Sequence, residues 1–181
     1  EGGTHVPAFW YWKGVLGEGV NIDALTAHID LYKTFSDLAG VTLPADMQDL
    51  DGRSLLPLLE NPQATWPDRK LFVNIGRWKA GEEEAAKYRK YTVRTEQWRF
   101  SNDSELYDID KDPAEISNIA SSHPEVVKEL RSAYDEWWAS ARPLMVNEGL
   151  PTVEPEDQPL TVRYEKQLEE NGIPEWSPAS F

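Results

Sequence analysis

One long amphipathic segment follows four short runs of β-prone residues, and this order constrains the fold more than any other feature of the sequence. Apolar residues recur at helical spacing between Ser122 and Pro143, which predicts a helix with one buried face. That face comprises Val127, Leu130, Tyr134, Trp137, Trp138 and Ala141. The β-prone runs are 71–75, 91–94, 98–100 and 106–109, and residues 101–104 are typical of a hairpin turn. The sequence therefore predicts an antiparallel sheet with the helix packed on it.

Local signals indicate where this helix and an earlier one begin and end. Glu125 follows Ser122 by three residues, which is the spacing of a capping box at the start of the long helix. A second helix is expected earlier in the chain, with Asp30 as its N-cap and Gly40 just past its carboxyl end. The apolar stripe of that helix consists of Leu31, Phe35 and Leu38.

The remaining parts of the chain have a different pattern. Residues 8–12 form a continuous apolar and aromatic run, which is typical of a strand covered on both faces. Residues 41–70 are interrupted by prolines and are expected to be irregular. From residue 144 onward the chain is acidic and rich in proline, so we expect an extended tail, with a short helix over 161–171 that Gly172 ends.

Composition excludes several classes of protein. The 181 residues include 18 basic and 32 acidic side chains, so a net charge of -14 disfavours binding to nucleic acid or to anionic membrane surfaces. No apolar stretch is long enough to span a bilayer. The absence of cysteine excludes disulfides, thiol chemistry and cysteine-bound zinc within this sequence. Glu1 is not a translation start, so we expect the chain to be processed, trimmed or part of a longer protein.

Local sequence offers little catalytic chemistry. There is no Gly-x-Ser-x-Gly, no His-Glu-x-x-His and no phosphate-binding glycine loop. Of the three histidines, His123 is expected to face solvent or to take part in capping, and His28 is expected to be a buried structural residue. His5 follows two glycines and precedes the apolar run, so it is our candidate for the edge of a pocket.

The order of several short motifs is more informative than any one of them. The motifs are Glu1–Pro7, Trp12–Gly14, His28–Tyr32, Asp37–Gly40, Asp51–Leu59, Val93–Thr95, Trp98–Phe100, Glu105–Ile109, Asp112–Glu115 and Asn118–Ala120. In this order and spacing they resemble the carboxy-terminal third of the arylsulfatase-type sulfatases, which belong to the alkaline phosphatase superfamily. The resemblance runs through residues 1–142.

The resemblance implies an α/β fold in which a large domain is followed by a smaller subdomain. Residues 1–60 would be the end of the large α/β domain and would supply its last strand and helix. Residues 61–142 would form the carboxy-terminal subdomain, a four-stranded antiparallel sheet with one packed helix. This division agrees with the pattern of the residues themselves. Residues 143–181 would be an acidic, proline-punctuated tail.

The resemblance also implies which catalytic parts lie elsewhere. Sulfatases hydrolyse sulfate esters with a formylglycine made from the Cys or Ser of a Cys/Ser-x-Pro-x-Arg motif, and they bind a divalent cation, usually calcium, through residues of their amino-terminal part. That motif does not occur in this sequence, so we expect no catalytic residue, cofactor or metal ligand within it. His5, Arg77 and Trp78 are the candidates for one wall of the substrate pocket. Most relatives have Arg in place of His5, which leaves the substrate open.

The expected partners are the rest of the sulfatase chain and a sulfated small molecule or glycan, and the exported bacterial relatives imply a periplasmic or secreted location. Two alternatives remain open. One is a non-catalytic glycan-binding or structural domain whose loop tryptophans stack on sugars, and the other is part of a phosphodiesterase or phosphonate hydrolase of the same superfamily. Residues 8–12 would expose an unpaired apolar edge in the isolated chain, so we also expect self-association.

Overall fold

The computed structural model describes residues 6–47, 50–76, 78, 81–144 and 155–173. The chain divides into two compact units, residues 1–142 and residues 143–181. Within the described residues, no helix combines the length and the apolar character that a membrane crossing requires.

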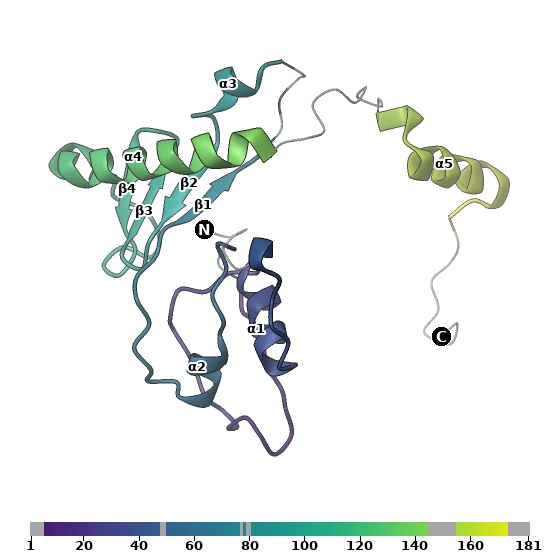
Figure 1. Ribbon diagram of the computed structural model, residues 1–181. Helices are drawn as coiled ribbons and strands as arrows, with labels where there is room; N and C mark the ends of the chain where they lie inside the picture. The colour runs from purple at the N-terminus through teal and green to yellow at the C-terminus, as the bar shows by residue number, and fades with distance from the viewer. Residues whose placement is uncertain (1–5, 48–49, 77, 79–80, 145–154, 174–181) are drawn as a thin grey trace. The chain divides into compact units, whose positions relative to one another are not determined.

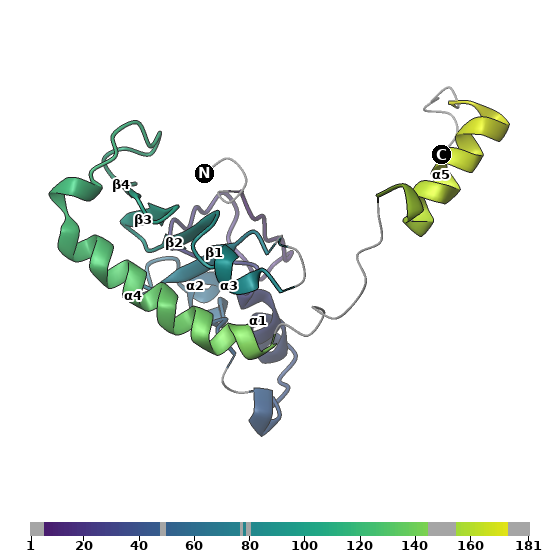
Figure 2. The same ribbon diagram turned by 90° about the horizontal axis from the view of Figure 1, so that it is seen from above.

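The first unit contains a four-stranded antiparallel sheet with one long helix lying across it (Figures 1 and 2). Strands β1 (Leu71–Asn74), β2 (Tyr91–Arg94), β3 (Trp98–Ser101) and β4 (Glu105–Asp108) pair in chain order. Helix α4 (Pro124–Ala141) packs on the sheet through its buried residues. The predicted sheet and its packed helix are confirmed.

The core of this unit lies between α4 and the sheet. The strand register aligns one apolar row across all four strands, made up of Phe72, Val93, Phe100 and Leu106. On the helix side, Tyr134 has no exposed area, and its ring stacks on Tyr91 with centroids 4.0 Å apart. Burial of each such large apolar side chain contributes about 1.5–3 kcal/mol relative to leaving it exposed. The aromatic stripe of α4 therefore contributes to the stability of the sheet.

Helix α4 does not begin as the capping-box pattern predicts. Its N-cap is His123, Pro124 is the first helical residue, and no side chain caps the end. Ser122 closes the preceding short 3₁₀ helix η2 (Ala120–Ser122), so its hydroxyl lies one residue too early to cap α4. Proline is favoured at the first helical position because it lacks an N–H that would need a partner there. The capping-box prediction is wrong.

Helix α1 (Asp30–Leu38) has the predicted carboxyl end but a different amino end. Ile29 is the N-cap, and Asp30 is the first helical residue with a buried side chain. At the carboxyl end Gly40 has φ +64°. The N–H groups of Gly40 and of the residue after it both donate to carbonyl oxygens of the last turn. This is a Schellman motif, so the role predicted for Gly40 is confirmed.

The rest of the first unit consists of short elements and loops. The proline-interrupted region holds η1 (Ala45–Met47) and α2 (Leu56–Glu60), and Leu58 of α2 is buried. Helix α3 (Glu83–Ala86) follows β1, and η3 (Arg142–Leu144) follows α4 and includes the first two residues of the second unit.

Contrary to prediction, the structure has no strand at residues 8–12. Phe9 is 91% exposed and Tyr11 is 83% exposed, while Trp10 packs against Phe35 of α1 with ring centroids 5.7 Å apart. A strand forms only where a neighbouring strand supplies hydrogen-bond partners. Strands β1–β4 pair only with one another, and no described residue forms strand pairing with residues 8–12. Residues 8–12 therefore have the apolar pattern of a buried strand but lack the neighbouring strands that would complete it.

The second unit contains η4 (Pro155–Asp157) and α5 (Pro159–Asn171). Gly172, which has φ +65°, ends α5. The helix predicted over 161–171 and its stop at Gly172 are confirmed, and the helix begins two residues earlier than predicted.

Candidate functional site

The structure describes one of the three residues predicted to line a substrate pocket. His5 and Arg77 lie outside the described residues. Trp78 follows β1 and packs edge-on against Trp138 of α4, with ring centroids 5.9 Å apart and ring planes at 64°. This contact holds the half-buried Trp78 in the aromatic layer beside α4. A contact between Trp78 and substrate stays a prediction.

The carboxylate of Asp30 joins three separate segments of the first unit. Both of its oxygens accept from Nη1 of Arg69, at 2.7 and 2.9 Å. The backbone N–H groups of Ala27 and Arg53 also donate to this carboxylate, at 2.7 and 2.8 Å. Nη2 of Arg69 donates to the carbonyl oxygen of Asp51 at 3.1 Å. The Asp30 side chain has no exposed area and that of Arg69 is 5% exposed, so this is a buried ion pair with several hydrogen bonds.

Gly52 allows two backbones to approach closely at the same junction. A Cβ at this position would lie 2.0 Å from the carbonyl oxygen of Ile29, so no side chain fits. Nearby, Nζ of Lys33 donates to the carbonyl oxygen of Leu50 at 2.8 Å. Glycine at position 52 therefore lets this segment lie against the amino end of α1.

A second set of hydrogen bonds connects this junction to the sheet. Oδ1 of Asp68 accepts from the N–H of Glu96, in the turn between β2 and β3, at 3.0 Å. The guanidinium of Arg53 donates to the carbonyl oxygens of Pro67 and Asp68, at 2.5 and 3.3 Å. The Asp30–Arg69 pair and these bonds together fix α1 and the sheet within one unit.

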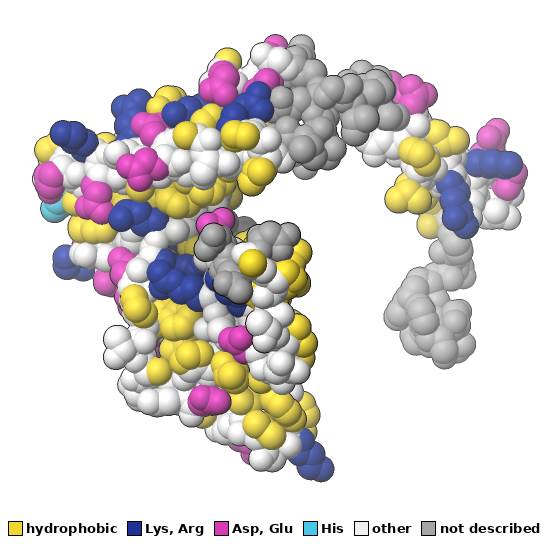
Figure 3. All heavy atoms as spheres, in the orientation of Figure 1, with side chains coloured by type: hydrophobic (Ala, Val, Ile, Leu, Met, Phe, Trp, Pro, Cys, Tyr) yellow, Lys and Arg dark blue, Asp and Glu magenta, His cyan; other side chains and the backbone are white. Residues whose placement is uncertain are grey.

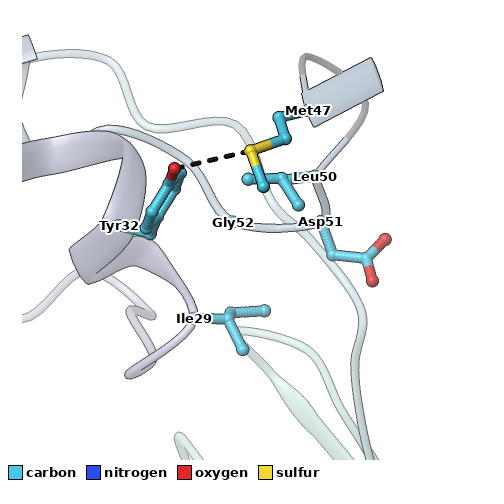
Figure 4. Close-up of a pocket in the computed structure, with 6 residues that line it drawn as sticks. All are labelled: Ile29, Tyr32, Met47, Leu50, Asp51 and Gly52. Carbon is cyan, nitrogen blue, oxygen red and sulfur yellow. Dashed lines mark hydrogen bonds between the residues drawn. The ribbon is translucent and has the colours of Figure 1, made fainter. Parts of the chain in front are cut away.

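A shallow pocket of about 370 Å³ lies beside the junction (Figure 4). It lies between the amino end of α1 and the segment that follows η1, and its lining residues are Ile29, Tyr32, Met47, Leu50, Asp51 and Gly52. The Tyr32 hydroxyl donates to Sδ of Met47 at 3.5 Å. The lining is mainly apolar, and one carboxylate with one phenol does not provide a nucleophile activated by a base. The pocket suits contact with an apolar group rather than catalysis.

The histidines and acidic residues of the described chain do not form a metal centre. His28 is exposed in the turn before α1, so the prediction of a buried structural histidine is wrong. His123 is half-buried beside Trp98, with ring centroids 5.4 Å apart. Within the described ranges, no group of three or more histidine, aspartate or glutamate side chains could hold a metal ion.

The shifted pKa values belong to structural contacts. A hydrogen bond from Nζ of Lys111 lowers the pKa of Asp108, which also accepts from the Gln97 amide at 3.0 Å. Burial raises the pKa of Tyr91, whose hydroxyl donates to Asp103 at 2.9 Å. These groups stabilise the sheet and its turns, and none of them faces the pocket at α1.

The fold and the order of its elements agree with a match to a known family. Residues 1–139 match the family model described as N-sulphoglucosamine sulphohydrolase, C-terminal. Because this match covers well over half of the chain, the chain belongs to this family and is a carboxy-terminal part of a sulfatase.

Curated relatives support the same assignment. The chain is 30% identical over 174 residues to the uncharacterized sulfatase YdeN of Escherichia coli K12, covering 78% of this chain and 30% of that protein. It is 32% identical over 139 residues to arylsulfatase K of Rattus norvegicus, and this match covers 72% of this chain and 24% of that protein. It is 33% identical over 139 residues to the N-acetylglucosamine-6-O-sulfatase of Bacteroides thetaiotaomicron, again covering 72% and 24%. The chain thus spans 24–30% of the length of these relatives.

Proposed function

We propose that this chain is the carboxy-terminal part of an enzyme that removes sulfate from sugars, either from an O-sulfate ester or from an N-sulfo group. The observation that carries the proposal is the match of residues 1–139 to the carboxy-terminal model of a sulphoglucosamine sulphohydrolase. The name of the Bacteroides relative adds N-acetylglucosamine-6-O-sulfate to the substrates worth testing. A periplasmic or secreted location belongs to the same proposal.

The role of this chain within the enzyme is that of a scaffold and one wall of the substrate cleft. Large apolar side chains of the first unit are exposed, including Phe9 at 91%, Tyr11 at 83% and Phe35 at 55%. Exposed apolar surface of this extent is typical of an interface that another part of the protein covers. We assign the cover to the remainder of the sulfatase chain, with residues 8–12 pairing as a strand there.

We expect the catalytic groups of such an enzyme to lie outside the described residues. Sulfatases of the type that the sequence resembles use a formylglycine nucleophile and a divalent cation, which together supply attack on sulfur and stabilisation of charge on the sulfate oxygens. The described residues do not fit a calcium site, because they contain no cluster of three or more acidic or histidine side chains that could hold a metal. We therefore assign no step of the reaction to a described residue, and His5, Arg77 and Trp78 remain candidates for substrate contact.

The test compares the full-length enzyme with the chain 1–181. Release of sulfate is measured from an aryl sulfate, from N-sulfoglucosamine and from N-acetylglucosamine-6-O-sulfate, with bis-p-nitrophenyl phosphate as the phosphodiester control. We expect the full-length enzyme to release sulfate from a sulfated sugar and the chain 1–181 to release none. Turnover of the phosphodiester without sulfate release, or turnover by the chain 1–181 alone, would overturn the proposal.

A further inference from the structure

Helix α5 carries an apolar stripe that no described residue of its own unit covers. The stripe consists of Leu160, Tyr164 and Leu168, which recur at every fourth residue and are 78%, 59% and 36% exposed. In Figure 3 hydrophobic side chains gather on one side of α5, and charged side chains occupy the other. Val162 is half exposed on the opposite side of the helix, because it lies two residues from the stripe. We call the three residues the α5 stripe.

The stability of α5 calls for a partner. A helix of 13 residues is marginal in water, since most helical stability in proteins comes from packing of an amphipathic face. Within α5 one ion pair is present, between Lys166 and Glu170 at 3.9 Å, and such exposed pairs contribute little. The family match ends at residue 139, so α5 lies beyond the domain that the match defines.

The charge of this region indicates the kind of surface that α5 can dock on. Residues 143–181 contain eight acidic and two basic side chains, a net charge of -6. Residues 1–142 carry the remaining -8 of the total of -14. Both parts are acidic, so charge repulsion disfavours docking of α5 on residues 1–142, whether of the same chain or of a second copy. A complementary surface has an apolar floor for the stripe and lysine or arginine at its rim.

We propose that the α5 stripe docks into an apolar groove rimmed by basic residues on the amino-terminal body of the same polypeptide. This inference rests on the proposed function, because it takes the chain as the end of a longer sulfatase. The part of the Escherichia coli and rat relatives that this chain does not cover, 70% and 76% of their length, is large enough to carry such a groove. A helix tethered to that body has an effective concentration of about 1 mM at nearby sites, so a few apolar contacts are sufficient for docking. Docking of this kind is the helix-in-groove mode of recognition.

The test is amide hydrogen exchange of residues 159–171, measured by mass spectrometry in the full-length enzyme and in the chain 1–181. We expect exchange to be at least about tenfold slower in the full-length enzyme, because docking suppresses local opening of α5. The double variant Tyr164→Ala/Leu168→Ala should lose this protection. The matched control Val162→Ala removes an apolar side chain from the opposite side and should keep it.

Two kinds of result would overturn the inference. One is equal exchange of α5 in both proteins, whether fast or slow, because equal slow exchange would assign the groove to residues 1–181 themselves. The other is protection in the chain 1–181 that rises with its concentration, which would assign the groove to a second copy. Sulfate release is measured on the same preparations. Protected α5 without sulfate release would refute the proposed function alone, whereas sulfate release with unprotected α5 would refute this inference alone.

Discussion

Replacement of Arg69 by methionine should destabilise the first unit strongly, because it would leave a buried carboxylate without its cation. Asp30 has no exposed area, and both of its oxygens accept from Nη1 of Arg69. Removing one partner of a buried ion pair typically costs about 3–5 kcal/mol of unfolding free energy. Asp30 would keep the N–H donors of Ala27 and Arg53, so we expect a loss at the lower end, about 3 kcal/mol.

A double-mutant cycle separates the ion pair from simple loss of packing. Asp30→Asn removes the negative charge and keeps the side-chain shape, so in that background Arg69→Met should cost less than it does in the wild type. The difference between the two costs is the coupling energy, which we expect to be at least about 1 kcal/mol for groups in direct contact. The matched control is Lys70→Met, because Lys70 forms an exposed ion pair with Glu129 at 3.0 Å. We expect this substitution to cost less than about 1 kcal/mol of unfolding free energy.

The assay is equilibrium unfolding of the chain 1–181 in guanidinium chloride, followed by tryptophan fluorescence and far-ultraviolet circular dichroism. Coincident transitions from the two signals are required before the free energies are compared. An Arg69→Met variant as stable as Lys70→Met would refute the reasoning. So would an additive cycle with no coupling between Arg69 and Asp30.

Three further predictions concern a close contact, a pH effect and an exposed segment. Gly52→Ala should cost at least about 2 kcal/mol in the same unfolding assay, because its Cβ would meet the carbonyl oxygen of Ile29 at 2.0 Å. Gly40→Ala, which has free space but φ +64°, should cost only about 1 kcal/mol. Asp108→Asn should lower the free energy of unfolding at neutral pH. The difference in unfolding free energy between wild type and this variant should shrink as pH falls below 3.8. The reason is that the lowered pKa of Asp108 favours the folded state only while the carboxyl of the unfolded state is ionised. Light scattering should detect association of the chain 1–181 at high concentration, and Phe9→Ser should reduce it.

Each of these predictions has a result that would contradict it. Equal costs for the two glycine variants would show that the contact with Ile29 is relieved without strain. A difference between wild type and Asp108→Asn that is constant from pH 7 to pH 3 would exclude the charged hydrogen bond as its source. A chain 1–181 that stays monomeric at every concentration would refute self-association through residues 8–12.

Local patterns predicted the elements whose stability depends on near neighbours in the sequence. The apolar spacing of α4 predicted a helix on a sheet, and Tyr134 of that helix is buried against the strands. Gly40 and Gly172 were predicted from their places after helical segments, and both have positive φ. These features follow from helical periodicity and from backbone sterics, which act over a few residues.

Local patterns failed where a residue has competing partners. Ser122 has the spacing of a cap, but Pro124 starts the helix one residue later than the capping box requires. Asp30 was predicted as a cap because of its place before an apolar stripe, whereas its partner in the structure is Arg69. Residues 8–12 have the composition of a buried strand, yet a strand also needs neighbours. Each error comes from an interaction that the local pattern does not contain.

The sequence by itself determined the family, the sheet with its packed helix, and the acidic charge that disfavours nucleic acid as a partner. Only the tertiary structure decided that Asp30 and Arg69, 39 residues apart, form a buried pair, and that Gly52 lies against the backbone of Ile29. It also placed Trp78 against Trp138 of α4, a contact that no spacing predicts. The physical reason is that periodicity and turn chemistry act between residues close in sequence, whereas these contacts exist only after distant segments have packed together.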